Sequence, residues 1–251
     1  MKVATPRPPI ALLLLSTALG VPPLLAETLL AETLSAESLR GVVRYVGPDV
    51  KPRMVSMAAD PKCAELHQGE RVADLSLRVG EGGALADAFV WLPAAPAGTG
   101  PFETPDQPVR LVQEGCFYHP RVAGIMVEQT LEVANDDPTL HNVRSLARAN
   151  RPINLGQPVG SPPRTKFFTK PEEAVKFKCD VHPWMASYLF VLDHPFYAAT
   201  GADGRFEIPN LPAGTHQISI WHELLGRRDL EVEVGSGSAP IEIEIEPPPS
   251  D

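Results

Sequence analysis

The stretch "AVKFKCDVHPWMASYLFVLD" (residues 174–193) reads as a strand, a short loop and a second strand. Its two flanks, AVKFKC and SYLFVLD, alternate or run apolar over strand lengths. The loop between them contains Cys179, His182 and Met185. A loop that leaves the first strand can fold these three side chains around one point. The sequence therefore predicts that a thiolate, an imidazole and a thioether meet at the end of a β-structure.

Similar strand-like segments recur along the chain between Gly, Pro, Asn and Asp residues. The chain has 28 prolines and 19 glycines but only 6% aromatic residues, which indicates many short turns and an all-β fold. Seven strands at this spacing favour a Greek-key sandwich or barrel. The polar, proline-rich stretch 144–173 is predicted to be a long ordered loop with room for one strand near residues 166–168. The other predicted strands are 39–47, 73–79, 85–93, 108–115 and 124–135.

A fourth donor is supplied by His141 in "NDDPTLHN" (residues 135–142), which follows a predicted strand and a turn. Two imidazoles, a thiolate and a thioether suit copper, because soft sulfur favours Cu(I) and imidazole supports Cu(II). Zinc fits less well because methionine is a poor zinc ligand. A binuclear copper centre would need a second cysteine in the loop, and the loop has none. The alternative is a metal-free core in which these side chains are simply buried.

The ordered donor set resembles the cupredoxin family of type 1 (blue) copper proteins, and its short C-x2-H-x2-M loop is most similar to that of amicyanin. Phe177 before the cysteine and Pro183 after the second histidine also match the family pattern. The stretch Asp180–Val181 departs from it, because a proline is common there in the family. The resemblance implies a Greek-key β-sandwich. It also implies one type 1 copper site held by His141, Cys179, His182 and Met185.

The resemblance further implies a supporting role for Asn142, which follows the first histidine. In the family, the asparagine at this position ties the two ligand loops together. We therefore expect Asn142 to link the His141 strand to the cysteine loop.

The remaining cysteines, Cys63 and Cys116, are expected to form a disulfide if the protein is exported. A zinc-like site is an alternative, because Cys63 with His67 and Cys116 with His119 have metal-ligand spacings. Two free thiols are the third possibility.

The N-terminus has the pattern of a secretory signal, with Lys2 and Arg7 before an apolar run. Cleavage is expected after Ala26, with Ala31 or Ala36 as other possible sites, and an uncleaved anchor is the alternative. Export places the protein in the periplasm or outside the cell, with no membrane span after signal removal. The net charge of −9 argues against nucleic acid and anionic lipid as partners.

A second module is expected after the copper domain. The stretch "GADGRFEIPNLPAGTHQISI" (residues 201–220) resembles carboxypeptidase regulatory-like, or transthyretin-like, β-sandwich modules. Strand 39–47 has a similar look and is a candidate to pair with that module. The predicted organisation is a signal at 1–26, a lead-in at 27–38, the copper domain at 39–194, the smaller β-sandwich at 195–247 and a disordered tail at 248–251.

The predicted function is that of a single-electron carrier, with no enzyme activity, because no nucleophile, phosphate loop or paired carboxylates are visible. His182, followed by Pro183 and Trp184, is expected to be the surface exit for electrons. An acidic protein suits a basic redox partner such as a c-type cytochrome. The alternatives are a copper-binding or storage protein, and a structural β-sandwich protein of the cell envelope.

Overall fold

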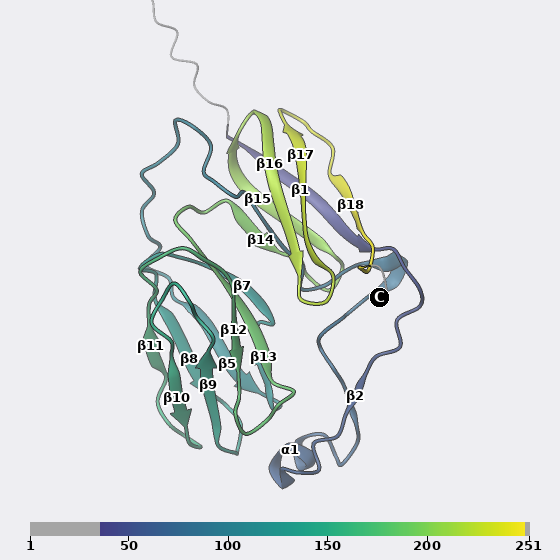
Figure 1. The fold of residues 1–251 in the computed structure, drawn as a ribbon, viewed down its shortest axis with the longest axis vertical. Coiled ribbons are helices and arrows are strands. Elements are labelled where there is room, and N and C mark those ends of the chain that lie inside the picture. The colour runs from purple at the N-terminus through teal and green to yellow at the C-terminus, as the bar shows by residue number, and fades with distance from the viewer. Residues whose placement is uncertain (1–35, 249–251) are drawn as a thin grey trace, which may run out of the picture. The chain divides into compact units, whose positions relative to one another are not determined.

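The computed structural model describes residues 36–248, and almost all of its regular structure is β-strand (Figure 1). The predicted all-β fold is therefore confirmed. The predicted signal, its cleavage sites at Ala26 and Ala31, and the end of the tail lie outside the described residues. Within residues 36–248, no helix is long and apolar enough to cross a membrane.

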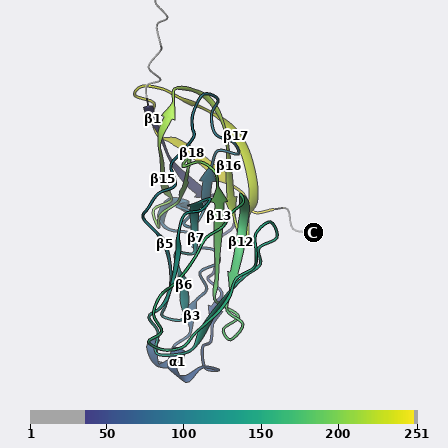
Figure 2. The same cartoon turned by 90° about the vertical axis from the view of Figure 1, so that its left-hand side faces the viewer.

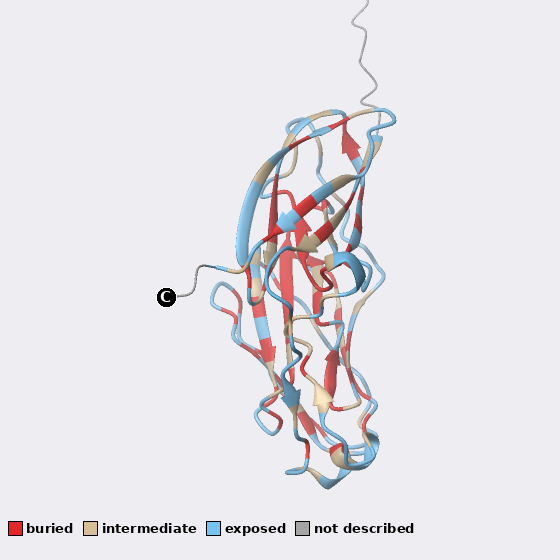
Figure 3. Cartoon of the chain, turned by 90° about the vertical axis from the view of Figure 1, so that its right-hand side faces the viewer, coloured by how far each residue is buried: buried red, intermediate tan, exposed pale blue. Residues whose placement is uncertain are grey.

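The first β-sandwich is built from residues 109–192. Its five-stranded sheet has the order β10-β9-β12-β13-β7, and its four-stranded sheet has the order β11-β8-β5-β6. Apolar side chains from both sheets are buried in one cluster, among them Leu111, Val143 and Leu189. Figure 3 shows buried residues along the strands. The strands are β5 (Val109–Glu114), β6 (Phe117–His119), β7 (Val122–Met126), β8 (Leu131–Asn135), β9 (His141–Ser145), β10 (Asn154–Gln157), β11 (Arg164–Lys166), β12 (Glu172–Lys178) and β13 (Ala186–Leu192).

Two sequence-based strand predictions are wrong in this sandwich. The segment 124–135 is two strands, because Glu128 adopts a left-handed conformation (φ 64°) and the chain turns between β7 and β8. The apolar pattern continues across this turn and hides it. The stretch 144–173 contains two strands where one was expected: β11 lies near the predicted strand at 166–168, and β10 was not predicted. Both lie at sheet edges, where a polar sequence is compatible with a strand.

The second β-sandwich consists of a three-stranded sheet, β15-β1-β18, and a four-stranded sheet, β14-β4-β16-β17. Its core contains a large apolar cluster in which Val43, Ile208 and Ile220 are each completely buried. The strands are β1 (Ala36–Tyr45), β4 (Phe89–Trp91), β14 (Tyr197–Ala199), β15 (Arg205–Pro212), β16 (Gly214–His222), β17 (Gly226–Val234) and β18 (Ile241–Ile245).

The predicted boundaries 39–194 and 195–247 do not match these sheets. β1 pairs with β15 and β18, and β4 pairs with β14 and β16, so two early segments complete the C-terminal sandwich. Ala36 already belongs to β1, so the lead-in ends before residue 38. Such pairings are long-range, and a division of the sequence into consecutive segments does not reveal them.

An aromatic cluster joins the two sandwiches. Phe89 of β4 stacks on Phe190 of β13, with ring centroids 4.1 Å apart. Beside it, the buried Arg121 donates to Glu223 of the β16–β17 turn at 2.7 Å. Figure 2 shows β13 and β16 in a second view. The first sandwich therefore meets the second through its β7–β13 edge.

The insertion between β1 and β4 carries a short helix. It contains β2 (Met54–Val55), α1 (Pro61–Leu66), β3 (Val72–Ala73) and the 3-10 turn η1 (Glu81–Gly83). Asp60 caps α1, because its carboxylate accepts from the backbone N–H groups of Lys62 and Cys63. Pro61 follows at the first helical position, which suits its fixed φ. Of the predicted strand 73–79, only Ala73 belongs to a strand, as the last residue of β3.

Candidate metal centre

The four predicted donor residues, His141, Cys179, His182 and Met185, are buried next to one another. None is more than 2% exposed. Ligand atoms of His141, Cys179 and His182 all lie within 4.8 Å of one another. Met185 is completely buried in the same apolar cluster as Cys179. The structure thus gathers two imidazoles and one thiol into a buried site, with Met185 in the apolar cluster that contains the thiol.

Strand pairing explains how these residues meet. β9 begins at His141 and pairs with β12, whose last residue, Lys178, lies opposite Arg144. Lys178 also lies opposite Ala186 of β13, so residues 179–185 form the loop that closes the β12–β13 hairpin. Within this loop, the N–H of Met185 donates to the carbonyl of His182 at 3.0 Å, which tightens the turn. The loop therefore lies beside the first residue of β9.

Asn142 links the two ligand-bearing segments. Its Oδ1 accepts from the backbone N–H of Asp180 at 2.7 Å and lies 3.5 Å from the sulfur of Cys179. Its Nδ2 donates to the carboxylate of Asp180 at 3.2 Å. These contacts hold the cysteine loop against β9.

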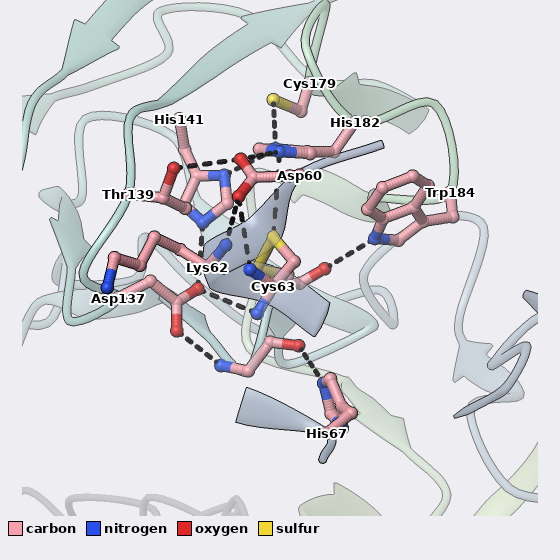
Figure 4. The surroundings of a disulfide bond; sticks show 12 residues. Asp60, Lys62, Cys63, His67, Asp137, Thr139, His141, Cys179, His182 and Trp184 are labelled. Atoms are coloured by element: carbon pink, nitrogen blue, oxygen red, sulfur yellow. Dashed lines mark hydrogen bonds and ion pairs between the residues drawn. A yellow bond between two sulfur atoms is a disulfide. The ribbon is translucent and has the colours of Figure 1, made fainter. Parts of the chain in front are cut away.

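A carboxylate orients each histidine ring. His141 Nε2 donates to Asp137 at 2.9 Å, and His182 Nε2 donates to Asp60 at 2.9 Å (Figure 4). Because a carboxylate only accepts, each ring holds a proton on Nε2, so a second proton on a charged ring lies on Nδ1 and must leave before that atom binds a metal. The two Nδ1 atoms then face each other at 2.8 Å. This arrangement leaves Nδ1 of each ring as the atom that can bind a metal.

Cys63 and Cys116 form a disulfide, so the zinc-like alternative built on these two thiols is wrong. His67 Nε2 instead binds the carbonyl oxygen of Gly115 at 2.8 Å, and His119 is exposed. The disulfide joins the two segments whose carboxylates orient the histidine rings. Cys63 lies in α1 next to Asp60, while the N–H of Cys116 donates to Asp137 at 2.8 Å.

The pKa values follow from these contacts in the metal-free protein. Burial raises the pKa of the Cys179 thiol, but hydrogen bonds from His141 and His182 outweigh burial and lower it to about 5. Burial lowers the pKa of His141, but Asp137 and the Cys179 sulfur raise it to about 9. Burial raises the pKa of Asp60, and its contacts with His182 and the start of α1 bring it down to about 2. The site therefore favours a thiolate, the form of cysteine that binds metals.

The prediction that His182 is a surface exit is wrong. His182 is 1% exposed, because α1 lies over it and places Asp60 and the sulfur of Cys63, at 3.7 Å, against its Nε2. The neighbouring Trp184 is half-buried, with its ring centroid 5.1 Å from that of His182. Its Nε1 donates to the carbonyl of Cys116 at 3.0 Å.

Sequence reasoning missed Asp60 and Asp137. Asp137 stands four residues before His141, in a segment that we interpreted only as a turn, so its spacing offered a signal. Asp60 is 122 residues away from His182 and shows only the helix-start pattern Asp-Pro. No local spacing relates it to the site.

No protein-family model and no curated protein sequence matches the chain. Solved structures do match parts of it. A copper-containing nitrite reductase from Thermus scotoductus SA-01 is 25% identical at a TM-score of 0.32, over 40% of this chain and 26% of that one. A purple cupredoxin from Nitrosopumilus maritimus is 23% identical at a TM-score of 0.28, over 33% of this chain and 97% of that one. A reduced amicyanin variant is 17% identical at a TM-score of 0.31, over 41% of this chain and 97% of that one.

These matches include cupredoxins, at low similarity and over part of the chain. The chain spans about a quarter of the nitrite reductase. None of the comparisons supports the predicted transthyretin-like resemblance of the second module.

The expectation that the protein has no enzyme activity is contradicted by the match to a nitrite reductase, which is an enzyme. The physical reason is that a site able to exchange single electrons can serve a carrier or a catalytic assembly. The lack of a nucleophile or acid–base motif therefore does not exclude catalysis, and the non-enzymatic assignment is not retained.

Proposed function

We propose that the cluster of His141, Cys179, His182 and Met185 binds one copper ion as a type 1 site and exchanges single electrons. The Nδ1 atoms of His141 and His182, the Cys179 sulfur and the Met185 sulfur would hold the ion. Bound copper would supply a reversible change between Cu(I) and Cu(II).

The observation that carries this proposal is the orientation of the two imidazole rings. Both Nε2–H groups donate to carboxylates at 2.9 Å, so both Nδ1 atoms are directed toward each other and lie near the thiol. A buried cluster of this kind is costly unless its polar atoms are satisfied. A copper ion would satisfy both nitrogens and the thiolate at once.

The protein contributes rigidity and dryness to the proposed electron exchange. Asn142 ties the cysteine loop to β9, and Asp60 and Asp137 fix the two rings. Ligands that hardly move when the metal changes its oxidation state allow fast exchange. Burial excludes water as an additional ligand.

The test is addition of Cu(II) to the mature protein, followed by absorption and electron paramagnetic resonance spectra. We expect an intense thiolate-to-copper band that Cys179→Ser abolishes and His182→Gln strongly weakens. His216→Gln is the matched control, because His216 lies in the second sandwich and binds the carbonyl of Pro212. A band that persists in Cys179→Ser would contradict the ligand assignment.

Copper storage is a second candidate function, and the burial of His182 beneath α1 favours it. A site closed in this way suits slow exchange with outside molecules. Reversible bleaching of the band by a reductant within milliseconds would support electron exchange. Bleaching over minutes, together with slow copper loss to a chelator, would support storage.

Export to the periplasm or cell exterior and a redox partner protein, such as a c-type cytochrome, also remain proposals. The disulfide supports export, because paired cysteines persist in oxidising compartments. N-terminal sequencing of the protein recovered from each cell fraction tests the cleavage site and the location together.

A further inference from the structure

We propose that a cavity beside the ligand loop binds a small anion and that this cavity is the place where a redox-active anion exchanges an electron with the site. The second half of this inference rests on the proposed copper function, whereas the first half does not. The cavity has a volume of about 410 Å³, which lies in the range of small-molecule sites.

The ligand loop itself forms one wall of the cavity. Pro183 and Trp184 line it directly after His182, and Ala186 of β13 lines it after Met185. The opposite walls come from the insertion before β2, from β12 and from the β16–β17 turn. The cavity is therefore bounded by both sandwiches and by the insertion that covers His182.

The cavity carries an excess of positive charge in an acidic chain. Its two carboxylates are already neutralised, because Asp74 accepts from Arg53 at 3.0 Å and Glu223 accepts from Arg121 at 2.7 Å. Two further lysines line it, and neither forms a direct ion pair within residues 36–248, although the charge of one of them, Lys176, also acts on Glu223. These are Lys51 and Lys176, both exposed. The whole chain has a net charge of −9, so this local excess is opposite in sign to the rest.

Lys176 is held in place by aromatic contact. Its ammonium lies 5.6 Å from the ring centroid of Tyr188, whose hydroxyl donates to Glu223 at 3.0 Å. An anion in the cavity would therefore meet a positioned cation rather than a freely moving side chain. This supports an anionic ligand over a neutral or cationic one.

Trp184 connects the cavity to the metal centre. Its ring lines the cavity and lies 5.1 Å from the His182 ring, and its Nε1–H bond to Cys116 fixes its position. The other approach to His182 is closed by Asp60 and Cys63. Among the described residues, Trp184 is thus the aromatic contact between the buried histidine and a cavity that can hold a ligand.

The electron exchange needs no bond making. An anionic one-electron donor such as ferrocyanide would be oxidised from Fe(II) to Fe(III) while Cu(II) becomes Cu(I), and no proton is released. The donor in the cavity would be separated from His182 by the Trp184 ring alone. We therefore expect electron exchange through Trp184 to be faster than exchange from the side of His182 that Asp60 and Cys63 cover.

Binding is tested first, on the metal-free protein, with the redox-inert anion hexacyanochromate(III) and nuclear magnetic resonance. We expect paramagnetic broadening of the Trp184 Nε1–H and Ala186 signals. The double variant K51Q/K176Q should bind at least about fivefold more weakly, because two cations next to the anion are lost. Lys170→Gln, which removes an exposed lysine outside the cavity, should leave binding unchanged. Broadening elsewhere, or equal weakening by Lys170→Gln, would overturn the site.

Electron exchange is tested second, on the copper-loaded protein. In K51Q/K176Q, the rate of reduction by ferrocyanide should fall about tenfold, while the rate with the cation hexaammineruthenium(II) should not fall. Added salt should slow the ferrocyanide reaction. Equal rates in both proteins would overturn the exchange role. A protein that never develops the copper band would instead refute the proposed function and leave the binding result standing.

Discussion

The two candidate ligand histidines have the same hydrogen bond but obtain it in different ways. His141 donates to Asp137, four residues earlier in the same sandwich, whereas His182 donates to Asp60, 122 residues earlier on the insertion. The first ring is oriented by a local turn and the second by a tertiary contact. The comparison teaches that one half of the site needs only the first sandwich to fold, while the other half also needs α1 to be in place.

The largest effect should come from removing the disulfide, since it holds α1 to the β5–β6 turn. It closes a loop with a sequence separation of 53, so C63S/C116S should lower the free energy of unfolding by about 4 kcal/mol. Urea unfolding measures this loss. We also expect the protected Nε2–H signal of His182 to disappear while that of His141 persists.

The matched comparison is the same protein with its disulfide chemically reduced, which should behave like the double variant. Loss of both histidine signals together would break the distinction between a local and a tertiary contact.

The next effect should separate the two carboxylates. Asp137 is 4% exposed and also accepts from Gly115 and Cys116, so Asp137→Asn should cost about 3 kcal/mol of stability. Asp60 is only half-buried, and Asp60→Asn should cost about 1 kcal/mol. Urea unfolding of both variants checks the order.

Both variants should also raise the copper reduction potential by tens of millivolts, because a nearby carboxylate stabilises Cu(II) over Cu(I). A shift of about 59 mV corresponds to about 1.4 kcal/mol. Unchanged potentials in both variants would show that the carboxylates orient the rings without affecting the metal.

The pH dependence of the metal-free protein should distinguish the two pairs again. The pKa of His141 is raised from 6.5 to about 9, so its contribution is complete below pH 6.5 and is lost as pH rises through about 9. The pKa of Asp60 is lowered from 3.8 to about 2, so its contribution is present above pH 3.8 and is lost as pH falls through about 2. For His141 alone the alkaline loss would be about 3 kcal/mol. The Cys179 thiol, whose pKa is lowered from 9.0 to about 5, gains stability over the same pH range, so we expect unfolding measured from pH 6 to 10 to show little net change. Asp137→Asn, which reduces the His141 contribution, should turn this into a net gain of stability as pH rises.

The smallest effect should come from the side chain that supports Asp60. Thr139 donates its hydroxyl to Asp60 at 3.0 Å, so Thr139→Val should cost about 1 kcal/mol or less. Thr165→Val, at an exposed position of β11, is the control and should cost less than that. Equal losses of stability in the two variants would mean that the Thr139 hydroxyl does not help to hold Asp60.

The sequence predicts the local half of the site well. Cys179, His182 and Met185 share one short loop, and the strands on either side are apolar enough to be recognised, so their convergence follows from spacing alone. His141 could be added because it follows a predicted strand. Asn142 and the disulfide followed from the family resemblance and from the expected export.

The remainder depends on contacts that no periodicity encodes. Asp60 reaches His182 because the insertion between β1 and β4 lies over the loop. Strand 39–47 was named as a candidate for the second sandwich, whereas segment 85–93, which contains β4, was assigned to the copper domain. The burial of His182 was missed for the same reason. β10 escaped prediction because edge strands tolerate polar residues.

The parallel pairing of β1 with β18 has a consequence for how the chain is made. Gly41 lies opposite Ile241, so the second sandwich cannot close until the last strand has left the ribosome. The first sandwich uses only residues 109–192 and can assemble while synthesis continues. A chain released after residue 200 should therefore already protect β12 and β13 from protease, while β1 still lacks its partners β15 and β18.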